Sequence, residues 1–348
     1  MTILNVVDFK KGLLNKMAIS ITAAGIAGAF LLPSGAAPGF DVQGHRGARG
    51  LMPENSLPSF AKALSIGVST LELDVGITKD GHVVVIHNPR LEPEIVRDKN
   101  GNWLTESGPA INSLTLEEVK SYDVGRLNPS SQYGHKYPDQ QAVDGTRVPT
   151  LGEVFELVKR SGNKDVRFNI ETKLTPENPG LSLPPADFAK AVIEVIKSYN
   201  MEHRVALQSF DWRTLQEVQR IAPEMTMSYL TVNQPWLNNL QTGQPGASPW
   251  MGGFDIDNYN GSAPRAVKDA GGDIWSSFHG EVTAQSIAIA HELGLLVKVW
   301  TVNERTRMEE LIDLGVDGII TDYPDVLRNV LEGRNIKLPE PTPVETYK

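Results

Sequence analysis

Short apolar segments alternate with longer segments of helical periodicity along most of the chain. The predicted strands are Phe40–Gly44, Thr70–Val75, Arg167–Glu171, Val205–Ser209, Thr226–Leu230, Gly272–Ser276, Leu296–Thr301 and Gly318–Thr321. The predicted helices are Ser56–Ile66, Leu151–Ser161, Ala186–Tyr199, Trp212–Ile221, Ala284–Leu293, Glu304–Leu314 and Pro324–Leu331. Roughly eight strands in alternation with helices predict an α/β protein with a TIM (β/α)₈ barrel. A doubly wound open sheet is the alternative, but no glycine-rich dinucleotide or phosphate loop follows the first strand.

The barrel is predicted for residues 38–333; two segments interrupt its alternation and a third follows it. Residues 91–147 are too long for a plain connection and predict an inserted subdomain over the barrel mouth, with one helix at Leu116–Ser121. The Thr231–Gly252 segment carries Trp236 and Trp250, and is either a substrate-lining loop or a packed surface loop. The proline-containing tail at 334–348 is expected to lack fixed structure.

The first 37 residues have the three parts of a secretory signal. Lysines precede an uncharged apolar run, Met17–Leu32, which is followed by small residues and Pro38. Cleavage is expected near Ala37. An uncleaved anchor is the alternative, although the run is short for a membrane span. The sequence thus predicts an exported protein, periplasmic or secreted, with no stable membrane anchor after cleavage.

Charge and cysteine content narrow the class of partner. The formal net charge of −9 argues against broad binding of nucleic acid or anionic membranes, and favours a small-molecule substrate. The absence of cysteine excludes disulfides, thiolate metal sites and a cysteine nucleophile. Nothing in the sequence predicts the oligomeric state.

Acidic side chains share one face of two predicted strands. Glu72 and Asp74 are two residues apart, as are Glu171 and Lys173, and alternate residues of a strand lie on the same face. In a barrel these side chains point inward near the mouth, together with Lys298 and Trp300. Any single acid could instead form a structural ion pair. Three together predict an oxygen-ligand site for Mg²⁺ or Ca²⁺ rather than Zn²⁺.

Two histidines are predicted to join these acids. His45 and Arg46 follow the first strand, where the chain enters a glycine turn. Asp80-Gly81 predicts a two-residue hairpin turn whose register would place His87 opposite Asp74; a three-residue bulged loop is the alternative. An imidazole titrates near neutral pH, so His45 and His87 are candidates for acid and base in phosphodiester cleavage. Arg46 can hold two phosphate oxygens.

The supporting roles are less specific. Lys173 and the cation would add positive charge at the phosphate. We expect Glu54 to support the site from behind, and Asp322 to belong to the barrel rim. Asn55 is either a helix N-cap or a site residue.

With these motifs in place, the chain resembles the glycerophosphodiester phosphodiesterase family. The matching pieces are GHRG at Gly44–Gly47, PENS at Pro53–Ser56, ELDV at Glu72–Val75, TKDG at Thr78–Gly81, HN at His87–Asn88, IETK at Ile170–Lys173, Gln208-Ser209-Phe210, VWTVN at Val299–Asn303 and DGIITDYP at Asp317–Pro324. They run in family order over nearly the whole chain after the signal. One departure is Asn88, where the family usually has aspartate.

The resemblance implies hydrolysis of glycerophosphodiesters to sn-glycerol 3-phosphate and an alcohol. It implies His45 and His87 as the acid–base pair, and one divalent cation, Ca²⁺ rather than Mg²⁺. The implied cation ligands are Glu72, Asp74 and Glu171. It further implies that Arg46 and Lys173 contact phosphate, and that Phe210 and Trp300 line the glycerol side.

Two other functions remain open at this point. One is a lysophospholipase D or sphingomyelinase D-like enzyme on the same barrel. The other is a non-catalytic ligand-binding barrel, which would be expected to lack one of the histidines or acids; none is missing here.

Overall fold

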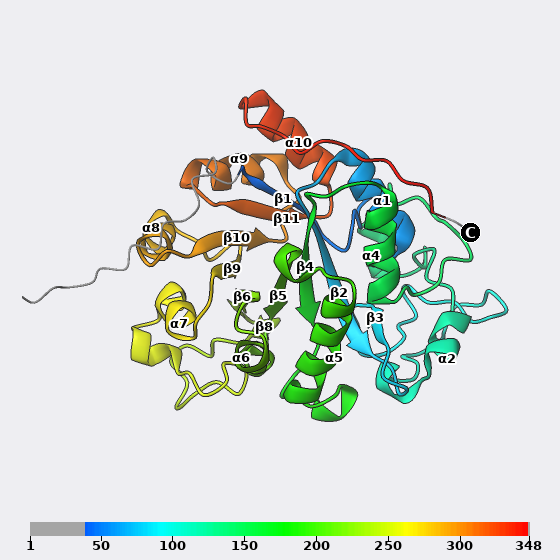
Figure 1. Cartoon of the computed structure of the whole chain (residues 1–348), viewed down its shortest axis with the longest axis horizontal. Coiled ribbons are helices and arrows are strands. Elements are labelled where there is room, and N and C mark those ends of the chain that lie inside the picture. Colours follow the sequence, from blue (N-terminus) through cyan, green and yellow to red (C-terminus); the bar gives the residue numbers. More distant parts are fainter. Residues whose placement is uncertain (1–38, 347–348) are drawn as a thin grey trace, which may run out of the picture. The chain divides into compact units, whose positions relative to one another are not determined.

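Eight parallel strands form a closed barrel in the computed structural model, which describes residues 39–346. They are β1 (Asp41–Gly44), β2 (Thr70–Ile77), β4 (Arg167–Thr172), β5 (Val205–Ser209), β6 (Thr226–Thr231), β9 (Ile274–Phe278), β10 (Leu296–Trp300) and β11 (Gly318–Thr321). They pair in chain order, and β1 pairs with both β2 and β11, which closes the barrel (Figure 1). The predicted TIM barrel is confirmed. The predicted secretory signal at 1–37 lies outside the described residues.

Helices surround these strands. They are α1 (Leu57–Ile66), α4 (Leu151–Arg160), α5 (Pro185–Ser198), α6 (Trp212–Ile221), α7 (Ala263–Asp269), α8 (Ala284–Glu292), α9 (Arg305–Leu314) and α10 (Pro324–Gly333). Short 3₁₀ turns occupy Ile111–Ser113, Pro179–Leu181, Glu202–Arg204 and Ile256–Tyr259. Of these eight helices around the barrel, only α7 was not predicted, because seven residues give a weak helical period. Between residues 39 and 346, no helix has the length and apolar character needed to cross a membrane.

Helix α1 shows how local sequence sets the element boundaries. The Ser56 side chain accepts a hydrogen bond from Ser59 N and caps the N-terminus. The helix ends at Gly67, whose φ of 91° favours glycine. The resulting segment packs Phe60, Ala63 and Leu64 into the core. The loop between β1 and α1, residues 45–56, therefore has both ends fixed.

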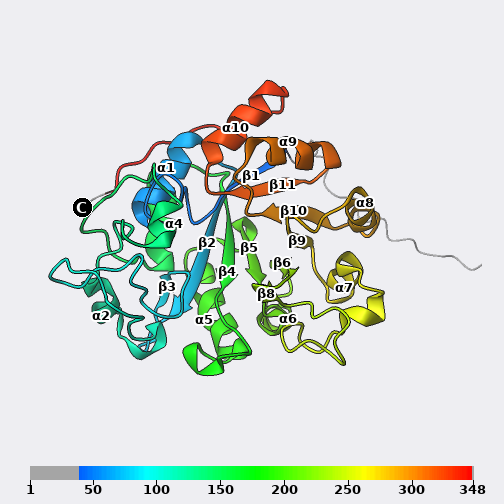
Figure 2. The same cartoon turned by 180° about the vertical axis from the view of Figure 1, so that it is seen from behind.

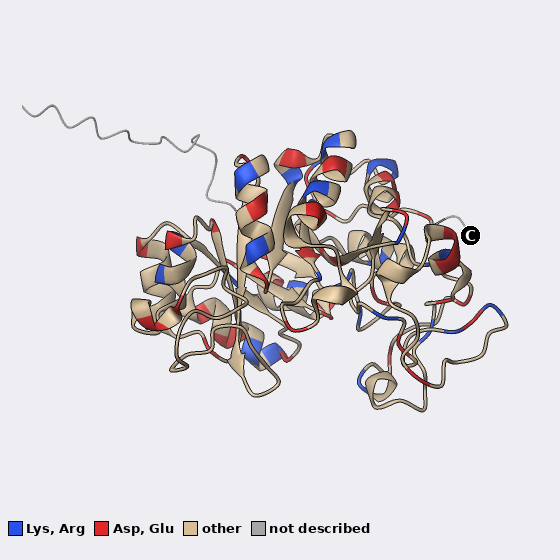
Figure 3. Ribbon diagram, turned by 90° about the horizontal axis from the view of Figure 1, so that it is seen from below, with Lys and Arg blue, Asp and Glu red and all other residues tan. Residues whose placement is uncertain are grey.

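Charged residues of both signs are interspersed along the outer helices (Figure 3). Several form exposed pairs, such as Arg305–Glu309 at 3.1 Å. Pairs of this kind contribute only about 0.3–0.5 kcal/mol each. Stability therefore comes mainly from the apolar layer between helices and barrel.

The hairpin after β2 differs from the predicted register by one residue. Strand β3 (Val83–Val85) pairs with β2 so that Val75 lies opposite Val85. A three-residue loop is formed because Thr78 N donates to His82 O at 3.0 Å and Gly81 adopts a φ of 85°. The ladder ends at Val85, and a bend rather than strand pairing brings His87 to the barrel mouth.

The insertion at 91–147 lies beside the barrel mouth rather than over it. It contains α2 (Leu116–Ser121) and α3 (Gln132–His135) and lies next to β3 in both views (Figures 1 and 2). Its apolar side chains form a separate small core with Val84 and Ile86. These two side chains are the reason for its position, because they give the insertion an apolar surface on the outer side of the hairpin.

Lys298 does not reach the mouth, contrary to the prediction. Strand register places it level with Gly318, which pairs with Asp41, the first residue of β1. Its ammonium group lies 3.1 Å from Asp41 Oδ2 at the opposite end of the barrel. The strand face was predicted correctly, but the side chain points toward the strand starts.

The tail is ordered as far as it is described, so the expectation of a tail without fixed structure is wrong for residues 334–346. Thr342 N donates to Leu64 O at 2.8 Å, and Arg328 donates to Pro339 O at 2.7 Å. Ile336, Leu338 and Val344 pack against the main core. These apolar residues, spaced among the prolines, give the tail a surface to bury.

The ion pair between Asp41 and Lys298 should contribute to the acid sensitivity of the barrel. Burial raises the pKa of Asp41, but Lys298 and Arg167 outweigh it and hold this pKa well below the ordinary value. Asp41→Asn leaves the buried Lys298 ammonium without its counter-charge. We expect a loss of about 3–5 kcal/mol in the free energy of unfolding at pH 7.

Urea denaturation at pH 7 and pH 3 would check this prediction. Asp41 contributes fully above the unfolded pKa of about 3.9, and its contribution falls as pH approaches the lower folded pKa. The difference between wild type and Asp41→Asn should therefore shrink at pH 3. Asp144→Asn removes a half-exposed carboxylate that pairs with Arg126 and Arg97, and it should cost less than about 1 kcal/mol because Arg97 keeps its pair with Asp123. An equal loss at both pH values would contradict the assignment.

Candidate active site

A cavity of about 420 Å³ opens at the mouth where the barrel strands end. Its floor is polar, and its walls are mainly apolar. The floor residues are His45, Arg46, Arg49, Glu72, His87, Glu171, Lys173 and Gln208. The apolar wall residues are Pro89, Leu174, Leu181, Phe210, Leu230, Trp236, Leu237, Trp250, Trp300 and Ile320. The cavity thus combines a charged end with an uncharged, largely apolar outer part.

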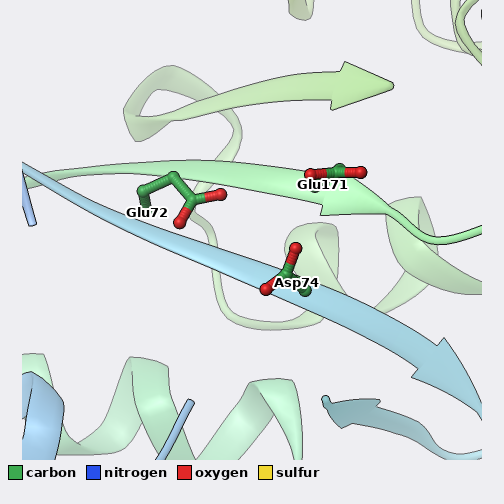
Figure 4. Close-up of side chains that lie close together, drawn as sticks. All are labelled: Glu72, Asp74 and Glu171. Carbon is green, nitrogen blue, oxygen red and sulfur yellow. The ribbon is translucent and has the colours of Figure 1, made fainter. Parts of the chain in front are cut away.

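Three buried carboxylates meet at the polar end (Figure 4). Glu72 and Asp74 come from β2 and Glu171 from β4, and register places Asp74 directly beside Glu171. One oxygen from each residue lies within 4.8 Å of the others. The sequence predicted this grouping from strand alternation alone.

Neighbouring donors fix two of the carboxylates. Gln208 donates to Glu72 at 2.8 Å, and the backbone N–H of Arg46 donates to its other oxygen at 2.9 Å. Asn55 donates to Asp74 at 2.8 Å. Asn55 is therefore a site residue, while Ser56 is the N-cap.

The electrostatics of the three acids favour an added positive charge. Burial and the nearby Asp74 raise the pKa of Glu72 well above its ordinary value. Burial, opposed by Lys173, raises the pKa of Glu171 to about 7. Buried Asp74 Oδ1 has no hydrogen-bond partner among the described residues; Lys173 Nζ lies 3.8 Å away. An all-oxygen donor set with one unpaired buried oxygen fits a hard divalent cation.

His45 is held from behind by Asp322. Its Nδ1 lies 2.7 Å from Asp322 Oδ1, and a carboxylate only accepts, so Nδ1 carries the proton. The other nitrogen, Nε2, lies 3.9 Å from Glu72 Oε2. Burial and the guanidinium of Arg49 lower the pKa of His45 to about 4 against the pull of Asp322. His45 is thus a neutral imidazole whose Nε2 is free to exchange a proton.

His87 is held from both sides of its ring. Its Nδ1 bonds to the side-chain oxygen of Asn88, and its Nε2 accepts from Lys173 Nζ at 3.0 Å. Burial, together with the charges of Arg46 and Lys173, lowers the pKa of His87 well below its ordinary value. Despite the register error, the structure brings His87 to the acids, as predicted.

The two basic residues each contact an acid at the floor. Arg46 pairs with Glu54 at 2.6 Å, and its Nε lies 3.2 Å from Asp74. Lys173 donates to Glu171 at 2.7 Å. Glu54 lies behind Arg46, as predicted.

Aromatic side chains line the outer part of the cavity. The rings of Phe210 and Trp300 pack edge to face, with their centroids 5.2 Å apart. The ring centroid of Trp236 lies 6.2 Å from that of Trp300. Trp236 is 59% exposed at the opening. Because Trp236 and Trp250 both line the cavity, the Thr231–Gly252 segment is a lining loop and not only a packed surface loop.

Sequence reasoning missed Arg49 and underestimated Asp322. Arg49 makes two hydrogen bonds to Asp322, at 2.8 and 3.0 Å. The signal for Asp322 was present, because it directly follows β11, which pairs with the strand that leads into His45. Arg49 lies in a loop with no strand alternation, so nothing in the sequence indicated its direction.

A barrel mouth that groups acids, two neutral histidines and basic side chains defines an enzyme site for phosphate esters. The glycerophosphoryl diester phosphodiesterase family matches residues 45–326. The chain therefore belongs to this family and is an enzyme that cleaves glycerophosphodiesters.

Individual proteins show the same relationship. A glycerophosphodiester phosphodiesterase from Caldanaerobacter subterraneus subsp. tengcongensis is 32% identical over 290 residues, which is 83% of this chain and 97% of the relative. A human lysophospholipase D is 27% identical over 82% of this chain and 84% of its own length. A solved structure of a candidate glycerophosphoryl diester phosphodiesterase from Silicibacter pomeroyi is 37% identical, with a TM-score of 0.77. It covers 87% of this chain and 97% of that one.

The three carboxylates should make the folded protein more stable when Ca²⁺ or Mg²⁺ is added. A cation at one hundred times its Kd would add about 2.7 kcal/mol, because it binds only the folded site. Thermal denaturation after EDTA treatment and cation addition measures the effect. Glu171→Gln should lose most of the shift, since it removes one anionic ligand.

Glu281→Gln is the matched control. Glu281 accepts a hydrogen bond from Gln234 at 2.7 Å and lies outside the group of three acids. This variant should keep the full cation-dependent shift. A shift that is equal in wild type and Glu171→Gln would show that the cation binds elsewhere.

Proposed function

We propose that this enzyme hydrolyses glycerophosphodiesters in a metal-dependent reaction that uses His45 and His87 as its acid–base pair. The products would be sn-glycerol 3-phosphate and an alcohol. The observation that carries the proposal is the meeting of a group of three buried carboxylates with two histidines at one barrel mouth. Family membership supports the substrate class.

The two histidines would divide the proton transfers. The attacking oxygen, in the family mechanism the glycerol 2-hydroxyl, must lose a proton, and the departing alkoxide must gain one. The unprotonated Nε2 of His45 can accept a proton, since Asp322 stabilises the imidazolium that results. His87 would give the other proton to the alkoxide: its Nε2 would take that proton from the Lys173 ammonium, which already donates there, while Asn88 holds the Nδ1–H. Water would then open the cyclic phosphate, and the same two groups would act in reverse.

Arg46 and Lys173 would bind the phosphate oxygens. Both line the cavity beside the acids, and their charges remain close to where negative charge develops. Glu72, Asp74 and Glu171 would hold the divalent cation, which when bound supplies further charge neutralisation at the phosphate. We propose Ca²⁺ in preference to Mg²⁺, because Ca²⁺ tolerates an irregular set of oxygen ligands. Phe210 and Trp300 would pack against the glycerol carbons.

A second candidate function is cleavage of lysophospholipids. Its support is the outer cavity wall, where the lining residues are apolar or uncharged and include Trp236, Trp250 and Leu237. Such a wall suits a hydrocarbon chain better than a charged head group. The matched human relative is named lysophospholipase D.

A substrate panel tests both functions. Release of glycerol 3-phosphate from glycerophosphocholine and glycerophosphoethanolamine, and of choline from lysophosphatidylcholine, would be measured before and after EDTA and cation add-back. We expect turnover of the soluble diesters, its loss in EDTA and its return with Ca²⁺. Full activity in EDTA would remove the metal from the proposal. Turnover of the lysolipid alone, sensitive to Trp236→Ala, would establish the second function instead.

Each of the two histidines should be required for turnover on its own. His45→Ala and His87→Ala should each lower kcat by roughly 10²–10⁴-fold, because each removes one proton-transfer step. Circular dichroism and thermal denaturation would verify the fold. His291→Ala is the control, since it removes another histidine paired with an aspartate, Asp317 at 2.9 Å, outside the cavity. An active His87→Ala protein would refute its assigned role.

A further inference from the structure

One segment of the insertion contacts the loop that carries His45 and Arg46. Gln140 donates to Arg49 O at 2.8 Å, and Gln141 N donates to Leu51 O at 2.9 Å. Tyr133 and Tyr137 extend from the same segment, with ring centroids 5.4 Å apart. The contact therefore involves backbone and side chains on both sides.

The first tyrosine contacts the support of Arg46. The Tyr133 hydroxyl donates to Glu54, whose other oxygen accepts from Arg46 at 2.6 Å. It also accepts from Arg49 at 3.0 Å. Tyr133 is thus linked through a single residue, Glu54, to Arg46, the residue predicted to bind phosphate.

The second tyrosine contacts the support of His45. The Tyr137 hydroxyl donates to Asp322 Oδ2 at 3.3 Å, and the Arg49 guanidinium lies 5.0 Å from the centre of its ring. Asp322 in turn holds His45 and is completely buried. Tyr137 itself is 8% exposed, so its hydroxyl has little access to water.

The loop needs outside support because part of its backbone is strained. Arg46 has a φ angle of 50°, in the left-handed region that residues other than glycine and asparagine rarely adopt, whereas Asn55, with a φ of 52°, is of a type that tolerates this region. A conformation such as that of Arg46 costs of order 1–3 kcal/mol and persists only when surrounding contacts hold it. The hydrogen bonds from Gln140 and Gln141 fall between these two residues.

We propose that the insertion positions the catalytic loop through Tyr133 and Tyr137, rather than covering the substrate. Tyr137 would orient His45 through Asp322, and Tyr133 would orient Arg46 through Glu54. A lid is disfavoured, because none of the described residues that line the cavity lies within 91–147. The inference rests on the roles proposed for His45 and Arg46.

Tyrosine-to-phenylalanine variants test this proposal, because phenylalanine keeps the ring and removes only the hydroxyl. Tyr137→Phe should lower kcat roughly tenfold with little change in KM, since it loosens the group that transfers a proton. Tyr133→Phe should act mainly by raising KM, since it loosens the group that binds phosphate. The full-length, cation-loaded enzyme and glycerophosphocholine would be used for both.

A spectroscopic measurement separates positioning from general stability. In protein labelled with ¹⁵N-histidine, the His45 Nδ1–H bonded to Asp322 should give a downfield signal, assigned by its loss in His45→Ala. Tyr137→Phe should shift or broaden this signal, whereas Tyr133→Phe should leave it closer to its wild-type position. The signal does not depend on turnover, so it tests the positioning even if the proposed function fails.

Tyr259→Phe is the matched control, because the Tyr259 hydroxyl also donates to an aspartate, Asp269, in an exposed position. It should leave kcat, KM and the His45 signal unchanged. Arg49→Lys provides a second approach, since it keeps the charge and loses the two-point contact with Asp322; it should alter the His45 signal as Tyr137→Phe does. The proposal is overturned if both tyrosine variants stay within twofold of wild type, or if Tyr137→Phe leaves the His45 signal in its wild-type position.

Discussion

The crowding of three buried carboxylates at the ends of β2 and β4 determines the arrangement of the whole site. Ionised acids within 4.8 Å of one another repel strongly in a poorly solvated interior. Arg46 and Lys173 reduce this repulsion by charge, while Gln208 and Asn55 reduce it by hydrogen bonding. Two of these four groups, Arg46 and Lys173, are the ones proposed above to bind the phosphate.

The barrel and the acidic group could be predicted because both depend on period-two alternation. Glu72, Asp74 and Glu171 lie where strand parity placed them, and each barrel strand was found within a few residues. Lys298 shows the limit of this reasoning: parity gives the face of a strand, but not the end of the barrel toward which a long side chain extends.

Loop-borne residues could not be placed in the same way. His87 reached the site through a bend, since a single glycine in the left-handed region changed the hairpin register. Arg49 and Tyr133 are close in space but 84 positions apart, and both lie outside strands. Their contact depends on how the insertion packs against the hairpin, which is a tertiary property. The ordered tail has the same origin, because its few apolar residues bury themselves only on a surface made by other segments.

The ordered tail also bears on how the enzyme can be handled. Residues 337–340 and Thr342 line a hollow together with Phe40, Ser69 and Arg167, which lie at or just before the starts of β1, β2 and β4. This is the end of the barrel away from the mouth, because parallel strands all run the same way. An affinity tag or surface linkage that continues from this segment would leave the cavity facing solution, so the enzyme could be immobilised there with its opening unobstructed.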